Sequence, residues 1–375
     1  MLNRFIILFL FLTIMAYGQD PSFTHFSNNP MYFNPAFTGI KEGSRIFIND
    51  YKQWAKYSTK FNYCNLAFDY KSYNNEVPGL GIIAVNDLEG DGGLSTTQLG
   101  GLVSYGWQAN KKLLFQGGIS ASYVNRRIDW NKFIFSDQLL IDGNIKNSNF
   151  TPPPKNSTNY IDFTSGMLFE YFTKTPKSVY QNNYGEDNII ITSGYAIHHP
   201  SRPNQSITSG TSRLPIRHVF HLSVDFPFNH SENIYWKTSV MYERQQAFQN
   251  ILAGVDFSRT FTYNIGIWLK SNNQLFQNGL TSIIVSAGSK LTNKIYSKVS
   301  VGFSLSSNVS ALGLGPNYEI SLLFDSDPFS KKHINNHRYN CAKKYHTERI
   351  KKTPYIKKTP FSKKQKRKRS DKHFH

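Results

Sequence analysis

Apolar and polar residues alternate along most of this chain with a period of two. In 113–125 the odd-numbered positions from Leu113 to Tyr123 are mostly apolar, whereas the even-numbered positions from Gln116 to Ser122 carry Gln, Gly and Ser. Segments 159–173 and 295–305 repeat the alternation. This pattern is typical of β-strands that have one apolar face. Glycine and small polar residues on the second face fit a crowded or wet barrel interior.

Fourteen segments are predicted to be strands: 45–54, 61–72, 79–87, 98–107, 113–125, 159–173, 188–199, 217–227, 234–244, 249–257, 262–270, 279–289, 295–305 and 317–325. Most have the ~9–11 residues that a tilted membrane strand needs, and an even number is typical of single-chain bacterial barrels. We therefore predict an all-β fold, a transmembrane antiparallel β-barrel of about 14 strands over 43–325. An irregular segment at 19–42 precedes it, and a basic C-terminal tail at 326–375, which we expect to be disordered, follows it.

The connections between the predicted strands fall into a short and a long set. If the first strand begins on the periplasmic side, the connections 88–97, 126–158 and 200–216 face outside, and most periplasmic turns are short, as expected of outer-membrane barrels. The periplasmic connection 174–187 breaks this rule, and a merged or missed strand pair would explain it. An even strand number places both the N- and the C-terminus in the periplasm.

The first residues of the chain predict export from the cytoplasm. Arg4 is followed by an apolar run at 5–15 and by Ala-Tyr-Gly at 16–18. A basic start, a short apolar run and small residues before a cleavage site describe a secretory signal peptide. The alternative is an uncleaved membrane anchor, although the run is short for a membrane span. We predict a signal peptide at 1–18, a mature chain that starts at Gln19, and a location in the outer membrane.

The formal net charge of +19 is concentrated at the C-terminus. From Lys331 onward the chain has 17 Lys and Arg against 2 Asp and Glu, whereas the rest has 26 against 22. Such a tail would be a disordered polycation, attracted to anionic headgroups by ~1 kcal/mol per basic residue near the surface, or to an acidic partner. A solvated tail without a specific role is the alternative. The residues assigned to anionic-surface contact are Lys363, Lys364, Lys366, Arg367, Lys368 and Arg369.

Two clusters could suggest a metal site. Asp87, Glu89 and Asp91 resemble the start of a calcium loop, but Gln98 stands where a bidentate glutamate is expected, so a Gly-rich hairpin is favoured. Four histidines, at 198, 199, 218 and 221, lie in predicted strands, where 198 and 199 should face opposite ways. We interpret them as rim or lumen histidines. No nucleophile elbow appears, and we expect no enzymatic activity and no cofactor.

The segment from Gln19 onward reads QDPSFTHFSNNPMYFNPAFTG. It resembles the opening motif of the PorP/SprF family, which belongs to the type IX secretion and gliding-motility machinery of Bacteroidetes. The likeness continues in NDYKQW at 49–54, GLGIIAVND at 79–87, RRIDWNKFIFSDQL at 126–139 and GPNYEISLLF at 315–324. It covers about residues 19–325, and the basic tail has no counterpart.

The resemblance implies a non-catalytic outer-membrane barrel that helps to export or retain surface proteins delivered by the type IX system. It implies type IX secretion components, secreted cargo proteins, periplasmic or lipoprotein envelope components and outer-membrane lipid as partners. An outer-membrane channel for small solutes or lipids is the alternative, suggested by the polar inner face. A nucleic-acid-binding protein is suggested only by the basic tail; because the signal peptide argues against it, we expect no nucleic-acid partner.

The opening motif also has a physical interpretation. Its three prolines fix φ and block regular ladder pairing, and its aromatic residues supply apolar surface. We expect an ordered, irregular segment inside the barrel or on its periplasmic rim, which either plugs the lumen or docks a partner. The residues assigned to this role are Pro30, Tyr32, Asn34, Pro35, Phe37, Gly39 and Trp54.

Overall fold

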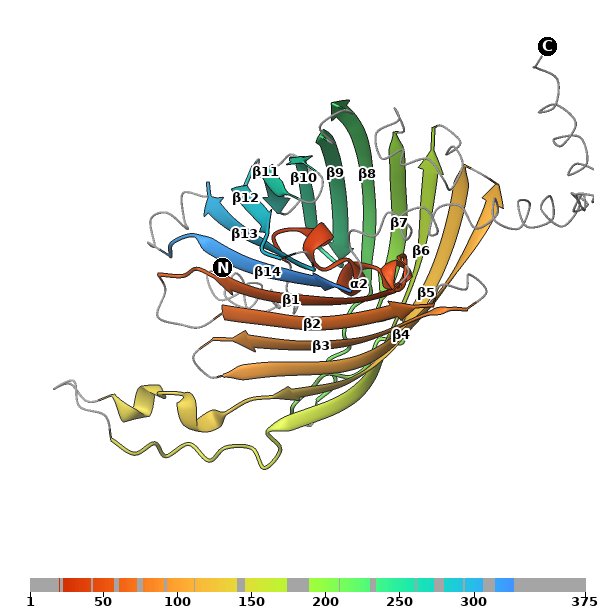
Figure 1. The fold of residues 1–375 in the computed structure, drawn as a ribbon. Coiled ribbons are helices and arrows are strands. Elements are labelled where there is room, and N and C mark those ends of the chain that lie inside the picture. The colour runs from red at the N-terminus through yellow and green to blue at the C-terminus, as the bar shows by residue number, and fades with distance from the viewer. Residues whose placement is uncertain are drawn as a thin grey trace, which may run out of the picture.

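The computed structural model describes residues 20, 23–41, 43–56, 61–72, 77–90, 93–110, 112–139, 146–173, 189–208, 210–229, 234–259, 262–272, 280–292, 294–305 and 314–326. Fourteen antiparallel strands close into one barrel, with the N-terminal segment inside it (Figure 1). The predicted fold class and strand number are confirmed. The predicted signal peptide and the basic tail from 327 onward lie outside the described residues.

The strands are β1 (Gly43–Gln53), β2 (Phe61–Lys71), β3 (Gly79–Glu89), β4 (Leu94–Asn110), β5 (Leu113–Arg127), β6 (Ser157–Phe172), β7 (Ile190–His198), β8 (Arg217–Asn229), β9 (Ile234–Gln245), β10 (Phe248–Arg259), β11 (Tyr263–Asn272), β12 (Ser282–Lys290), β13 (Ile295–Ser304) and β14 (Asn317–Asp325). No helix among the residues that the structure describes is long and apolar enough to cross a membrane.

The last strand pairs with the first. β14 runs antiparallel to β1, with Phe324 opposite Ile46 and Tyr318 opposite Lys52. Each strand therefore pairs with two neighbours, and the sheet has no free edge. Closure matters because hydrocarbon cannot hydrate unpaired backbone N–H and C=O groups.

Apolar side chains of the alternation face outward and polar ones face inward, as a membrane barrel requires. Apolar side chains such as Ile82 and Ile119 point outward and are more than half exposed, whereas Gln116 and Ser122 point inward and are buried. Buried polar and exposed large apolar residues invert the usual arrangement of a water-soluble protein. The outer wall is therefore suited to lipid.

We expect Ile119→Arg to destabilise the barrel in lipid far more than Ile134→Arg does. The two isoleucines are similarly exposed, at 64% and 61%, but Ile119 lies in β5 and Ile134 in the connection between β5 and β6. A lipid-facing arginine near the bilayer centre costs about 2–4 kcal/mol. Urea unfolding in lipid vesicles measures both losses, and equal losses would contradict a lipid-facing wall.

The two ends of the barrel carry connections of different length. At the end where β1 starts, the short-turn end, residues 111–112 join β4 to β5 and 230–233 join β8 to β9. At the opposite end, the long-loop end, 128–156 join β5 to β6 and 199–216 join β7 to β8. The predicted contrast is present, although 174–187, its exception, lies outside the described residues.

One strand extends well beyond its predicted bounds. The alternation predicts 98–107, whereas β4 runs from Leu94 to Asn110 and pairs with β5 from Ser95 onward. The residues Ser95 to Thr97 are polar on both faces, so the period-two signal fails there although the hydrogen-bond ladder continues. The connection after β5 projects beyond the barrel wall at the long-loop end (Figure 1).

Candidate functional site

The interior of the barrel contains the N-terminal segment, residues 20 and 23–41. Its short elements are η1 (Phe26–Asn28), α2 (Pro30–Phe33) and η2 (Pro35–Phe37). Pro30 and Pro35 each stand at the start of a turn, where the fixed φ of proline is suited. The Asn34 side chain accepts a hydrogen bond from the Ala36 backbone N at 2.9 Å and so caps η2.

The segment crosses the lumen from one end to the other. Asp20 contacts His199, just after β7, and Arg217, the first residue of β8, both at the long-loop end. Lys41 forms an ion pair with Asp325, the last residue of β14, at the short-turn end. The backbone between them therefore spans the interior before β1 begins.

Aromatic side chains supply the apolar contacts of the segment. The Phe23 ring lies 4.5 Å from the Tyr63 ring, 6.5 Å from Tyr51 and 5.5 Å from Tyr32, measured between centroids. All three contacts are edge-to-face, an arrangement worth about 0.5–1.5 kcal/mol per pair beyond area burial. Phe26 stacks on His221 at 5.6 Å. The hydrophobic core of the molecule thus forms between this segment and inward-facing wall residues.

A buried glutamate binds the middle of the segment. Glu319 of β14 accepts hydrogen bonds from the Thr24 backbone N at 2.7 Å, from the Thr24 hydroxyl, and from Asn28 Nδ2 at 2.8 Å. Ser321 Oγ donates to the same carboxylate at 3.1 Å. Hydrogen bonds to a charged acceptor are about twice as strong as neutral ones. Glu319 of β14 therefore holds Thr24 and Asn28 of the N-terminal segment in place, although they are far from it in the sequence.

Glycines in the wall make room for η2. A Cβ built on Gly118 would lie 2.5 Å from the Ala36 backbone N and from the Pro35 carbonyl, and one on Gly166 would lie 2.1 Å from Asn34 Oδ1. Asn34 Nδ2 donates to the Met167 carbonyl at 3.0 Å in the same region. The glycines of the inner face thus allow close approach of two backbones.

An ion pair organises the short-turn end. Asp69 of β2 pairs with Arg45 of β1 through two contacts, one of which joins Arg45 Nε to Oδ1 at 3.0 Å. Asp69 also accepts from the Gly39 backbone N at 2.7 Å, and Arg45 donates to the Phe37 carbonyl at 3.1 Å. Gly39 has φ of 56°, which favours glycine. The pair therefore ties the end of the segment to the wall.

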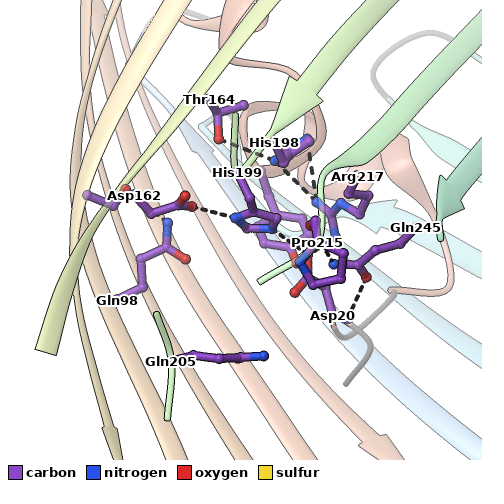
Figure 2. A network of polar contacts seen from close by, with 12 residues as sticks. Asp20, Gln98, Asp162, Thr164, His198, His199, Gln205, Pro215, Arg217 and Gln245 are labelled. Atoms are coloured by element: carbon purple, nitrogen blue, oxygen red, sulfur yellow. Dashed lines mark hydrogen bonds and ion pairs between the residues drawn. The ribbon is translucent and has the colours of Figure 1, made fainter. Parts of the chain in front are cut away.

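Three wall groups bind Asp20 at the long-loop end, the Asp20 site. Its carboxylate lies 2.7 Å from His199 Nε2 and 3.4 Å from Arg217 Nη1, and its backbone N donates to Gln245 Oε1 at 3.0 Å. Figure 2 shows His199 between Asp20 and Asp162, whose Oδ2 lies 2.7 Å from Nδ1. An ionised carboxylate only accepts hydrogen bonds, so both ring nitrogens donate and His199 is charged.

We expect the stability of the barrel to fall between about pH 6.5 and pH 9 through His199. Burial alone would lower its pKa, but Asp20 and Asp162 outweigh burial and raise the pKa to about 9. A raised folded-state pKa gives a contribution that is complete below the unfolded value of about 6.5 and lost as pH rises through 9. Urea unfolding in detergent against pH measures the slope.

The matched variant for that measurement is His199→Gln, which cannot titrate. It should make the slope between pH 6.5 and 9 clearly smaller than in the wild type. Burial would raise the pKa of Asp20, but His199 and Arg217 hold it well below its usual range. The Asp20 contribution is therefore complete above about pH 4 and is lost as pH falls. A slope unchanged in His199→Gln would contradict this assignment.

The structure brings together six of the seven residues assigned to the plug or partner-docking role. Those in the segment are buried or half-buried inside the barrel: Pro30, Tyr32, Asn34, Pro35, Phe37 and Gly39. Trp54 lies apart, at the long-loop end after β1, where its ring packs 5.1 Å from Phe61 and its backbone N donates to Asn317 Oδ1 at 2.9 Å. The tail residues from Lys363 to Arg369 lie outside the described residues.

Sequence reasoning assigned no role in binding the segment to the charged wall residues Arg45, Asp69, His199, Arg217 and Glu319, or to Asp20 in the segment itself. One signal was available, since Glu319 stands on the polar face of the last predicted strand. A charge that points into a lumen needs a partner. The sequence alone could not say that the partner is the N-terminal segment.

The structure corrects the interpretation of one histidine pair. His198 and His199 do not face opposite ways; both are buried, His198 against the Phe33 carbonyl at 3.0 Å. The strand ends at His198, and the φ of 58° at His199 turns its side chain back inward. The described residues contain no group of three His, Cys, Asp or Glu that could hold a metal, and Asp91 is outside them.

A closed barrel with an apolar outer wall and its own N-terminal segment bonded inside defines a membrane β-barrel protein whose lumen is occupied. Residues 15–324 match the family model described as type IX secretion system membrane protein PorP/SprF, and the chain belongs to this family. The resemblance predicted from the opening motif is confirmed. No curated protein matches the chain.

Solved structures of other barrels resemble this one only broadly. The toluene transporter TbuX of Ralstonia pickettii has 10% identity and a TM-score of 0.45, over 80% of this chain and 93% of that one. The CymD monoaromatic hydrocarbon channel has 12% identity and a TM-score of 0.43, over 83% and 95%. The KdgM porin has 9% and 0.36, over 75% and 98%. No functional conclusion rests on these likenesses.

Proposed function

We propose that this protein is a non-catalytic outer-membrane barrel of the type IX secretion and gliding machinery that aids export or surface retention of secreted cargo proteins. Membership of the PorP/SprF family supports a role in the type IX secretion machinery. The observation that carries the role is the occupied lumen, because the described part of one segment is bound at Asp20, at Glu319 and at Asp69. A barrel filled by its own chain is suited to a scaffold rather than to free diffusion.

The proposed orientation has the short-turn end in the periplasm, because periplasmic turns are the short ones in this class. Asp325 and the tail that follows then lie on the periplasmic side. Asp20, in contrast, lies at the long-loop end. We therefore propose that Asp20, the first described residue, lies inside the barrel towards its outer end.

The partners follow from this orientation and from the family. Type IX secretion components and secreted cargo are proposed at the barrel, and periplasmic or lipoprotein envelope components at the short-turn end. The basic tail, including Lys363, Lys364 and Arg367, is proposed to contact anionic lipid or an acidic envelope partner. No catalytic step and no cofactor belong to this role.

Deletion of the gene, followed by analysis of surface proteins, tests the proposed function. We expect particular secreted proteins to disappear from the surface and to return on complementation with the full chain. A complementing chain that lacks 327–375 separates the role of the tail from that of the barrel. An unchanged surface proteome in the deletion strain would contradict the proposal.

A channel for small solutes or lipids is the second candidate, and the polar inner face of the wall is the observation that favours it. Conductance in planar bilayers decides between the two. The scaffold role predicts a closed barrel for the full chain and conductance only after deletion of 20–39. Steady conductance by the full chain would favour the channel.

A further inference from the structure

We propose that His199 and Arg217 form a carboxylate-binding site, which the chain itself fills with Asp20 and which a carboxylate of another polypeptide can take over. The two residues come from the loop after β7 and the start of β8, and Gln245 at the end of β9 accepts a hydrogen bond from the Asp20 backbone N. Figure 2 shows the three around Asp20. The site belongs to the wall, and Asp20 belongs to the N-terminal segment.

The need for an anion follows from the burial of Arg217. Its side chain is 5% exposed, and its Nη1 donates to the Tyr32 hydroxyl at 3.1 Å and lies 3.4 Å from Asp20. The other titratable groups near it are His198, His199, Tyr63 and Glu243. Loss of Asp20 removes a charged partner from both Arg217 and His199, and losing a partner of a buried charge is destabilising. When Asp20 leaves, another carboxylate is therefore favoured at this position.

His199 gives the site its shape. It has φ of 58°, a left-handed conformation that costs energy for a residue with a Cβ and that clusters at functional sites. In this conformation one ring nitrogen faces Asp162 of β6 and the other faces Asp20. Asp162 belongs to the wall and holds the ring in place. The second nitrogen is thus oriented towards whichever carboxylate occupies the site.

The site opens onto a cavity of mixed polar and apolar lining. The cavity has a volume of about 80 Å³, and Asp20, Asp162, His199, Arg217 and Asp87 are among its lining residues. Asp162 Oδ1 and Arg217 Nε are buried without a hydrogen-bond partner among the described residues. This volume holds several waters and accommodates a small carboxylate beside the site.

The competing carboxylate is assigned to a polypeptide, and this assignment rests on the proposed function, since secreted cargo chains carry Asp and Glu side chains. Asp20 is favoured by its covalent attachment, which gives it a high effective concentration. A polypeptide that brings its own carboxylate to the long-loop end removes that advantage. Occupation by the newcomer would free the Asp20 end of the segment, while the Asp69 end stays bound.

Acetate rescue tests the site in the purified full-length chain. Asp20→Ala removes the carboxylate but leaves the wall residues intact. Acetate at ten times its dissociation constant should shift the unfolding equilibrium of Asp20→Ala about 10-fold towards the folded state, relative to equimolar chloride. The wild type and Asp225→Ala should not respond, because Asp225 pairs with Lys237 at 3.6 Å near the other end of β8 from Arg217. Equal effects of acetate and chloride on Asp20→Ala would overturn the proposal.

If Asp20→Ala does not fold in chloride, the refolding yield in acetate against chloride replaces the unfolding midpoint. Recovery in acetate supports the site, and failure in both salts contradicts it. The rescue experiment uses purified protein and measures no secretion. Its failure can therefore be told apart from a failure of the proposed function, which would appear as an unchanged surface proteome.

A second experiment, with added peptides, tests whether a polypeptide can supply the competing carboxylate. Met31 is buried in the segment, so Met31→Cys, in a chain without Cys64 and Cys341, reports release by maleimide labelling. We expect poly-glutamate to raise the labelling rate several-fold over poly-glutamine of equal length. Equal rates would overturn the exchange with a polypeptide carboxylate.

Discussion

Gly118→Ala should displace the N-terminal segment from the barrel interior. The new Cβ would lie 2.5 Å from the Ala36 backbone N and from the Pro35 carbonyl oxygen, and backbone atoms cannot move aside as a flexible side chain can. Overpacking of this kind costs about 1–3 kcal/mol. Urea unfolding in detergent measures the loss, and maleimide labelling of Met31→Cys reports the displacement.

The adjacent residue supplies the matched control. Gly117→Ala adds the same methyl group one position earlier in β5, where a Cβ would meet nothing within 4 Å. Neighbouring strand positions point to opposite faces, so only the inner one should matter. We expect Gly117→Ala to change stability by less than about 1 kcal/mol and to leave labelling slow. Similar effects of the two variants would contradict the placement of η2 against the inner wall.

Asp69→Ala should be the most damaging single change at the short-turn end. Asp69 is 1% exposed at its side chain and accepts from Arg45 and from the Gly39 backbone N. Its removal leaves the Arg45 guanidinium buried and uncompensated, which costs about 3–5 kcal/mol. Urea unfolding of the variant in detergent measures this loss.

Two variants make the Asp69 measurement decisive. Asp225→Ala removes a carboxylate that is 30% exposed and pairs with Lys237, so we expect about 0–1 kcal/mol from this pair. Arg45→Met with Asp69→Leu removes both charges, and such apolar replacement of a buried pair is often neutral. The double variant should therefore be more stable than Asp69→Ala. A double variant as unstable as Asp69→Ala would show that the loss does not come from the uncompensated Arg45 charge.

The barrel itself could be predicted from the chain because its signal is local. In β5, most residues from Leu113 to Tyr123 indicate by their polarity which face of the strand they lie on. The other strands of the barrel carry similar alternation. Where the local signal fails, so does the prediction: Ser95 to Thr97 extend β4, yet they are polar on both faces. The positive φ of His199 could not be predicted from the sequence either, because only a few per cent of non-glycine residues adopt it.

The site could be predicted only in part, since its contacts are long-range. The prolines and aromatics of the opening motif indicate an ordered segment in or near the barrel, and six of the assigned residues lie there. The contact between Thr24 and Glu319 joins residues near opposite ends of the barrel sequence, and no spacing rule reports it. Trp54 belongs to the next stretch of the family resemblance, NDYKQW, and β1 carries it to the opposite end of the barrel from Gly39.

Hydrogen–deuterium exchange of the full chain in outer-membrane vesicles tests the central claim most directly. Backbone amides of Thr24, Asn34, Ala36, Thr38 and Gly39 are hydrogen-bonded inside the barrel. We predict that peptides covering 23–39 exchange as slowly as peptides from β1 and β14. Exchange of 23–39 at the rate of an unstructured chain, with the strands still protected, would contradict a barrel filled by its own N-terminal segment.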